Sequence, residues 1–134
     1  MKKLIFVFCF LFSFNTMATE IYNCETLSGY STPLKKNEKE ITKTETVSDF
    51  KIVVDGKNSY ILTSDNQKTH LLLFNETDEK AELLEIGVVA SSIYSIDKKT
   101  KKILQAKNGI IPEDFSELLD IEIPYQIIMS GVCK

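Results

Sequence analysis

The chain has 134 residues, of which 43% are apolar and 26% are charged, with five glycines and three prolines. This composition is typical of a folded globule and excludes a disordered tail, a collagen-like chain and a cysteine-dense miniprotein. All 16 basic residues are lysines, against 19 acidic residues. The net negative charge and the absence of arginine therefore argue against a nucleic-acid partner.

Residues 1–18 have the pattern of an export signal that is removed from the mature protein. Lysines precede an apolar run over 4–14, and Thr16 and Ala18 are small residues placed before a cleavage site. An uncleaved membrane anchor is the alternative, but about eleven apolar residues span only about half of a hydrocarbon core. We expect one domain over 19–134, exported to a bacterial periplasm or secreted, with no stable membrane anchor after cleavage.

The number and positions of the cysteines also indicate an exported protein. Cys9 is removed with the signal, which leaves Cys24 and Cys133 near the two ends of the mature chain. An even number of cysteines in an exported chain indicates a disulfide. Two free thiols, or a redox or metal pair, are the alternatives, but the chain lacks a CxxC spacing. We predict a Cys24–Cys133 disulfide, which requires the first and last segments to lie side by side.

Short stretches with alternating apolar and polar residues dominate the mature chain, and they end at turn residues such as those at 55–58 and 97–101. The chain is therefore predicted to be mainly β, an antiparallel β-barrel or β-sandwich of about eight or nine short strands. The predicted strands are 21–25, 41–47, 50–54, 59–63, 69–75, 81–89, 92–96, 103–107 and 125–133.

The alternation also selects the side chains that should face the core, because successive residues of a strand point to opposite faces. The predicted core residues are Tyr22, Cys24, Phe50, Ile52, Val54, Tyr60, Leu62, Leu84, Ile86, Val88, Ala90, Tyr94, Ile96, Tyr125, Ile127, Met129 and Cys133.

Two stretches depart from the alternation. Residues 112–119 begin with a proline and two acids, and their apolar residues share one face with Ile111, which predicts one short helix. Residues 26–40 are predicted to form a loop, either functional or disordered.

Candidate chemical groups are few. His70 is the only histidine, which excludes a histidine zinc cage and any mechanism that needs two imidazoles. A lone general base remains an alternative, but no GxSxG motif or cysteine nucleophile accompanies it. We predict no enzyme, no catalytic residue, no metal site and no cofactor. A hydrolase with an unrecognised carboxylate site is the remaining enzymatic alternative.

Two charged stretches are predicted to be solvated hairpin tips. Residues 75–79 lack the central glycine of an EF-hand calcium loop. The lysines of 98–102 are expected to keep a hairpin soluble, and a patch for an anionic partner is the alternative.

Tyr22-Asn23-Cys24 near the mature start, with Cys133 at the end of the last predicted strand, resembles the layout of small periplasmic inhibitors of c-type lysozyme. Those inhibitors are compact β-barrels whose ends are tied by a disulfide, so the resemblance implies the same arrangement here. It covers the two termini and the length. The family's inhibitory loop carries a Ser-Gly-x-x-Tyr stretch, whereas Ser28-Gly29-Tyr30 is shorter and lies earlier, so no inhibitory residue is carried over.

We expect an exported, non-enzymatic binding protein that takes a small apolar ligand or a protein through its loops. A barrel of about eight strands can hold one small ligand in its interior. An enzyme inhibitor, acting through 26–40 or the loop that carries the predicted helix, is the first alternative. A structural protein of the cell envelope is the second.

Overall fold

The computed structural model describes residues 18–32, 41–46, 49–88, 90–109 and 125–134. Within these residues no helix is long and apolar enough to cross a membrane. The strands are β1 (Glu20–Cys24), β2 (Leu27–Ser31), β3 (Thr42–Thr46), β4 (Phe50–Val54), β5 (Tyr60–Thr63), β6 (Lys68–His70), β7 (Leu72–Glu76), β8 (Lys80–Ile86), β9 (Ala90–Asp97), β10 (Lys102–Gly109) and β11 (Tyr125–Val132), and one 3-10 turn is η1 (Gly56–Asn58). The prediction of a mainly β chain is confirmed.

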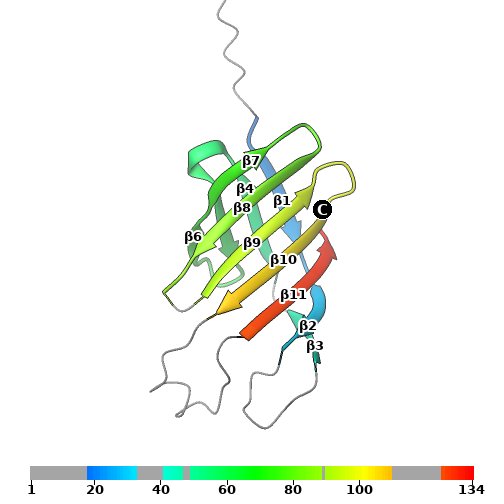
Figure 1. Ribbon diagram of the computed structural model, residues 1–134. Coiled ribbons are helices and arrows are strands. Elements are labelled where there is room, and N and C mark those ends of the chain that lie inside the picture. Colours follow the sequence, from blue (N-terminus) through cyan, green and yellow to red (C-terminus); the bar gives the residue numbers. More distant parts are fainter. Residues whose placement is uncertain (1–17, 33–40, 47–48, 89, 110–124) are drawn as a thin grey trace, which may run out of the picture.

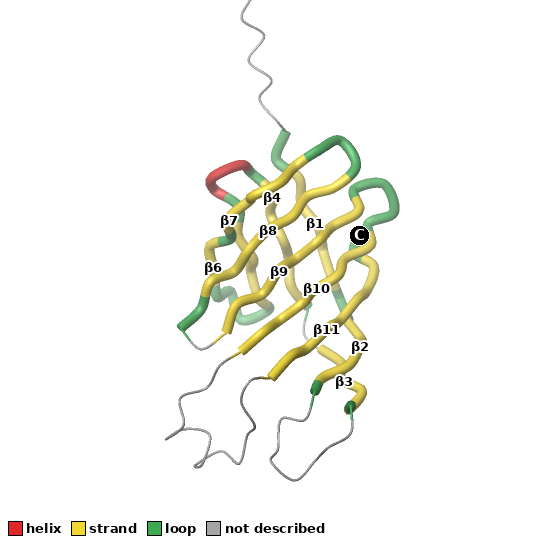
Figure 2. The backbone as a smooth tube through the Cα atoms, in the orientation of Figure 1, coloured by secondary structure: helices red, strands yellow, loops and turns green. Residues whose placement is uncertain are grey.

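The strands form two antiparallel sheets (Figure 1). The four-stranded sheet has the order β1-β4-β5-β6, and the seven-stranded sheet has the order β3-β2-β11-β10-β9-β8-β7. Figure 2 shows the seven-stranded sheet in front of the smaller one. The alternative of a closed barrel is wrong, because the described strands divide into two separate sheets. The predicted helix at 112–119 lies outside the described residues, and so does the predicted signal over 1–18 apart from its last residue.

Two connections between the sheets are very short. Residues 25–26 join β1 to β2, and Leu71 alone joins β6 to β7. Leu71 has no exposed area and donates its backbone N–H to the carbonyl of Ser59. The strand predicted over 69–75 is therefore two strands in different sheets, divided at a buried leucine.

The loop predicted over 26–40 contains β2, which lies between β11 and β3. Two serines and a glycine give this strand a weak β propensity, so the sequence did not predict it. Gly29 is required by packing, because a Cβ at this position would lie 1.9 Å from the backbone oxygen of Ile128. Residues 33–40 lie outside the described part of the chain.

Both sheets contribute to one hydrophobic core. The largest side chains buried to less than 2% include Tyr22 and Ile52 from the smaller sheet, and Leu83, Ile96 and Ile103 from the larger one. Ala90 and Ile127, also predicted for the core, are only half-buried. The predicted core residues that are confirmed are Tyr22, Cys24, Phe50, Ile52, Val54, Tyr94, Ile96, Met129 and Cys133. Burial of this apolar surface is the main source of stability.

The predicted core faces of β5 and β8 are wrong by one residue. Ile61 is buried, whereas Tyr60 and Leu62 are only half-buried. In β8, Leu83 is fully buried, whereas Ile86 is 71% exposed, and Val88 just beyond the strand is also exposed. Both strands carry apolar residues on both faces, so alternation alone could not choose between them, and a shift of one residue exchanges the faces.

The predicted disulfide is present. Cys24 and Cys133 are bonded, with their Cα atoms 4.2 Å apart, and both are buried. Backbone hydrogen bonds run in both directions between Asn23 and Lys134, at 2.9 and 2.8 Å. The end of the chain is therefore fixed to β1, which ties the two sheets together along this edge.

Candidate functional site

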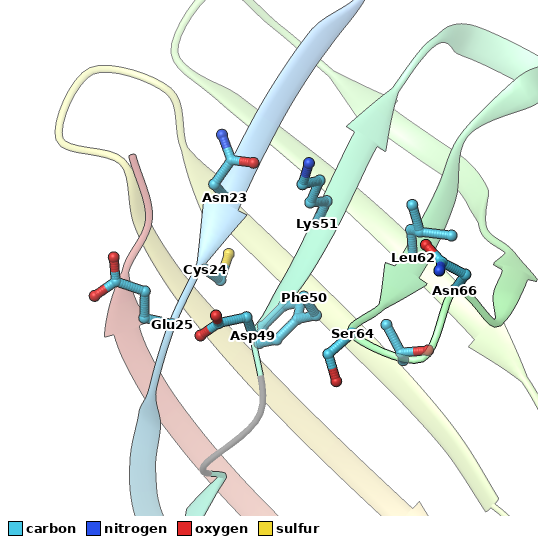
Figure 3. Close-up of a pocket in the computed structure, with 10 residues that line it drawn as sticks. Asn23, Cys24, Glu25, Asp49, Phe50, Lys51, Leu62, Ser64 and Asn66 are labelled. Atoms are coloured by element: carbon cyan, nitrogen blue, oxygen red, sulfur yellow. The ribbon is translucent and has the colours of Figure 1, made fainter.

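A cleft lies at one end of the four-stranded sheet, where the ends of three neighbouring strands meet. Because neighbouring strands are antiparallel, β1 ends here at Cys24, β4 begins at Phe50 and β5 ends at Thr63. The cleft has a volume of about 350 Å³ (Figure 3). Its lining residues are Asn23, Cys24, Glu25, Asp49, Phe50, Lys51, Leu62, Thr63, Ser64 and Asn66.

One charged residue of the cleft lining, Glu25, forms an ion pair with the last residue of the chain. Glu25 and Asp49 lie on the same side in Figure 3, and Lys134 forms an ion pair with Glu25. The hydrogen bond with Glu25, then the charges of Glu25 and Asp49, raise the pKa of Lys134. Both members of the Glu25 pair are well exposed, at 63% and 79%. An exposed pair of this kind contributes little to the stability of the fold.

A tight turn that follows β5 contributes Ser64 and Asn66 to the cleft lining. Asn66 has a left-handed backbone with φ 62°, which asparagine tolerates better than most residues. Its N–H donates to the carbonyl of Thr63 at 2.9 Å, and the Thr63 hydroxyl donates to Asp65. That hydrogen bond is the main cause that lowers the pKa of Asp65. These polar groups are satisfied within the turn, so they stabilise the fold.

His70 lies at the end of β6, away from this cleft's lining. Its Nε2 is 2.9 Å from the backbone oxygen of Lys57, which ties β6 to η1. The strand predicted over 69–75 would place His70 on one face with Leu72 and Phe74, but those two residues belong to β7 in the other sheet. Among the described residues, no group of three or more His, Cys, Asp or Glu side chains could hold a metal ion.

A partly buried ion cluster lies where β1 begins, β7 ends and the turn after β9 starts. Lys98 Nζ is 2.7 Å from Glu76 Oε1 and 3.2 Å from Glu20 Oε1. Tyr22 donates its hydroxyl to Glu20, and Lys101 Nζ lies 4.7 Å from the centre of the Tyr22 ring. The prediction of solvated hairpin tips is therefore wrong for Lys98 and Glu76, whose side chains are only 12% and 9% exposed.

The hydrogen bonds and opposite charges within this cluster shift the pKa values of its members. Burial acts to lower the pKa of Lys98, but hydrogen bonds to Glu76 and Glu20 outweigh burial and raise it. Burial acts to raise the pKa of Glu20, but the hydrogen bonds from Tyr22 and Lys98 hold it below its usual value. Burial and the neighbouring Glu20 raise the pKa of Tyr22 well above that of a free tyrosine. The charged forms of Glu20 and Lys98 are thus stabilised in the folded state.

A second internal network surrounds Tyr94, which is 3% exposed. Its hydroxyl donates to Glu85 Oε2 at 2.8 Å and accepts from Gln105 Nε2 at 3.0 Å. Burial, then the charge of Glu85, raises the pKa of Tyr94 well above that of a free tyrosine. Among the described residues no buried side-chain nitrogen or oxygen lacks a hydrogen-bond partner, so both internal networks are complete as they stand.

The outer face of the seven-stranded sheet is different, because it carries an apolar row. Six residues lie directly opposite one another across six strands: Leu72, Leu84, Ile93, Ala106, Ile128 and Tyr30, in the order β7 to β2. Four of them are exposed by 42% to 55%. This face is turned toward the viewer in Figure 1.

Uncharged residues flank the apolar row on both sides, and all of those named below are polar except Leu104, which is 47% exposed. One flanking row contains Ser95, Leu104, Ser130 and Ser28. The other contains Ser91, Asn108 and Gln126, in which the Gln126 amide donates to Asn108 at 3.0 Å. On the described strands β9, β10, β11 and β2, these three rows carry no charged residue, and charges begin at the rim with Glu82 and Lys43.

A charge-free area of this kind is uncommon in a chain of which 26% of residues are charged. Contiguous exposed apolar surface usually marks an interaction site, and depletion of charge is typical of the centre of a protein interface. We therefore treat the outer face, defined by the apolar row and its two flanking rows, as the candidate functional site.

Comparison of the chain with known protein families, curated proteins and solved structures finds no match. The candidate site therefore rests on its own geometry.

Proposed function

We propose that this chain is an exported, non-enzymatic binding protein with a sandwich-like β frame, and that the outer face of its seven-stranded sheet binds a protein. The apolar row carries this proposal, because six apolar side chains lie in register across the sheet and four of them are exposed by 42% to 55%. The disulfide between Cys24 and Cys133 is compatible with an exported protein. The alternative of an enzyme inhibitor is the case in which the bound protein is an enzyme and the complex blocks its active site.

The alternative of a small apolar ligand held inside the protein has less support. The space between the sheets contains one packed cluster of side chains, including Tyr22, Ile52 and Leu83. The cleft beside Cys24 is lined mostly by polar and charged groups, which do not favour a small apolar ligand. A protein partner needs no cavity, and it uses the surface that remains apolar and exposed.

A photo-crosslinking amino acid placed on the face tests the proposal in the cell that makes the protein. Replacement of Ile128 or Ile93 should give a covalent adduct of higher mass after illumination. Matched replacements at Ile21, which is 55% exposed on the other sheet, and at Lys51 in the cleft should give none. Adducts from Lys51 without adducts from Ile128 or Ile93 would overturn the proposal.

A further inference from the structure

We propose that the protein bound by the outer face is a second copy of the chain, packed about a two-fold axis that runs parallel to the strands between β9 and β10. This inference rests on the proposed function, because it names the partner of the same face. Two twisted sheets of the same hand pack well face to face with their strands nearly aligned.

The apolar row is complementary to itself under this axis. The rotation keeps each row in place and reverses the order of the strands, so every member of the row meets another member. The large and small residues at the centre are matched, because Ile93 of each copy lies over Ala106 of the other. The remaining pairs are Leu84 with Ile128 and Leu72 with Tyr30, and β3, outside the row, is left uncovered.

Charged residues at the rim of the outer face also favour a two-fold axis between β9 and β10. Ile96 and Ile103 are opposite one another and point to the core. The next residues, Asp97 and Lys102, therefore lie opposite one another on the outer face, where both are exposed. The axis places Asp97 of each copy over Lys102 of the other and forms two symmetric ion pairs.

A two-fold axis moved onto either neighbouring strand would bring like charges together. A parallel axis through β10 places Lys102 over its own copy, and one through β9 places Asp97 over its own copy. With the axis between the two strands, Glu82 instead meets Ser130, and Lys80 meets Val132, so no like charges oppose one another on the described strands. Complementary charges at a rim set the register of an interface more than its affinity.

The area is sufficient for a dimer. The row crosses six of the seven strands of the sheet. With strands about 4.8 Å apart and a contact about 20 Å long, two faces bury on the order of 1,000 Å² in total. That value reaches the lower limit for a specific interface, which is about 1,000 Å².

Sedimentation velocity of the exported, oxidised protein over a range of concentrations tests the dimer. We expect a concentration-dependent shift from one chain to two. Ile93→Lys should raise the dimer dissociation constant at least tenfold, because it buries a charge at the centre of the face. The matched variant Ile21→Lys, on the opposite side of the molecule, should leave it unchanged. An equal effect of both variants would overturn the inference.

Charge reversal tests the axis itself. Asp97→Lys and Lys102→Glu should each weaken self-association, because each variant opposes like charges across the axis. An equimolar mixture of the two should associate as strongly as the wild type, since both cross-pairs then become attractive. No recovery in the mixture, with both variants folded by circular dichroism, would exclude this axis.

Sedimentation and crosslinking together distinguish failure of the dimer from failure of the proposed binding face. A protein that sediments as one chain up to roughly 1 mM, the concentration of very weak binding, while Ile128 crosslinks to a different protein, would overturn the dimer and leave the binding face in place. Absence of any adduct from Ile128 and Ile93 would overturn both.

Discussion

Cys24 and Cys133 are 109 residues apart in the chain, yet their Cα atoms lie 4.2 Å apart in space. A bridge that closes so long a loop restricts the unfolded chain strongly. On the chain-entropy treatment we expect the Cys24→Ala/Cys133→Ala variant to lose about 4–5 kcal/mol of unfolding free energy, as an upper value. Urea unfolding of the oxidised protein and the variant measures the difference. A loss below about 1 kcal/mol would contradict the entropic argument.

Lys98 lies between two carboxylates, so its removal should destabilise the protein. Breaking a fully buried ion pair costs about 3–5 kcal/mol, and we expect a smaller loss of about 1–3 kcal/mol for Lys98→Met because Glu20 remains 34% exposed. Thermal unfolding at pH 7 measures this loss. Lys99→Met is the matched control, since Lys99 is exposed in the same turn, and it should change stability little.

The same cluster predicts how the difference between wild type and Lys98→Met depends on pH. The lowered pKa of Glu20 means that its contribution is present above the pKa of an unfolded glutamate, about 4.3, and is lost as the pH falls through the folded value. The raised pKa of Lys98 means that its contribution is present below the pKa of an unfolded lysine, about 10.4, and is lost as the pH rises through the folded value. Urea unfolding from pH 2 to pH 8 should therefore show the difference shrinking in acid. A difference that does not change with pH would show that lost packing, not charge, explains the variant.

Gly29 allows β2 to approach β11 closely. An added Cβ would lie 1.9 Å from the Ile128 oxygen and 2.7 Å from the Met129 Cα, both on the backbone. We expect Gly29→Ala to cost about 3 kcal/mol, because the strands must separate to accept it. Gly56→Ala is the control: Gly56 has φ +50° and no atom within 4 Å of the added Cβ, so only backbone strain of about 1 kcal/mol is expected. Urea unfolding of both variants tests the order, and equal losses would contradict it.

The signal prediction can be tested by mass. If cleavage follows Ala18, the mature protein begins at Thr19, whose hydroxyl donates to Asp55 at 3.2 Å, and β1 remains whole. Intact mass spectrometry of the exported fraction should give the mass of 19–134 less two hydrogens for the disulfide. A mass that includes residues 1–18 would contradict cleavage.

The sequence was sufficient for the strand-rich class, the turns and the disulfide because those depend on local patterns and on residue counts. Where one face of a strand is clearly more apolar, as with Ile52 and Val54, the alternation also predicted the core correctly. It failed where both faces are apolar, as at Leu83-Leu84, because the register of neighbouring strands decides which face is buried. It also failed for β2, whose pairing depends on a long-range contact at Gly29.

The candidate site could not be predicted for a related reason. The apolar row is assembled from six strands, and each strand contributes one residue that looks unremarkable in its own segment. Tyr30 lay in a predicted loop and Leu84 in a predicted core, so the sequence did not indicate that these residues share one exposed row. The ion cluster was missed similarly, because Lys98 and Glu76 meet only after β9 and β7 are placed in the sheet.

The position of β11 constrains the order in which the molecule can assemble. This strand follows all the others in the chain, yet it lies between β10 and β2 inside the seven-stranded sheet. The consecutive strands β7 to β10 can pair as soon as they are made, whereas β2 and β3 must wait for β11 to link them to the rest. Formation of the complete sheet therefore needs contacts between distant parts of the chain, which makes folding slow. Local hairpins such as β2-β3 and β8-β9 can therefore exist early, but the seven-stranded sheet becomes one continuous sheet only when the final strand of the chain is added.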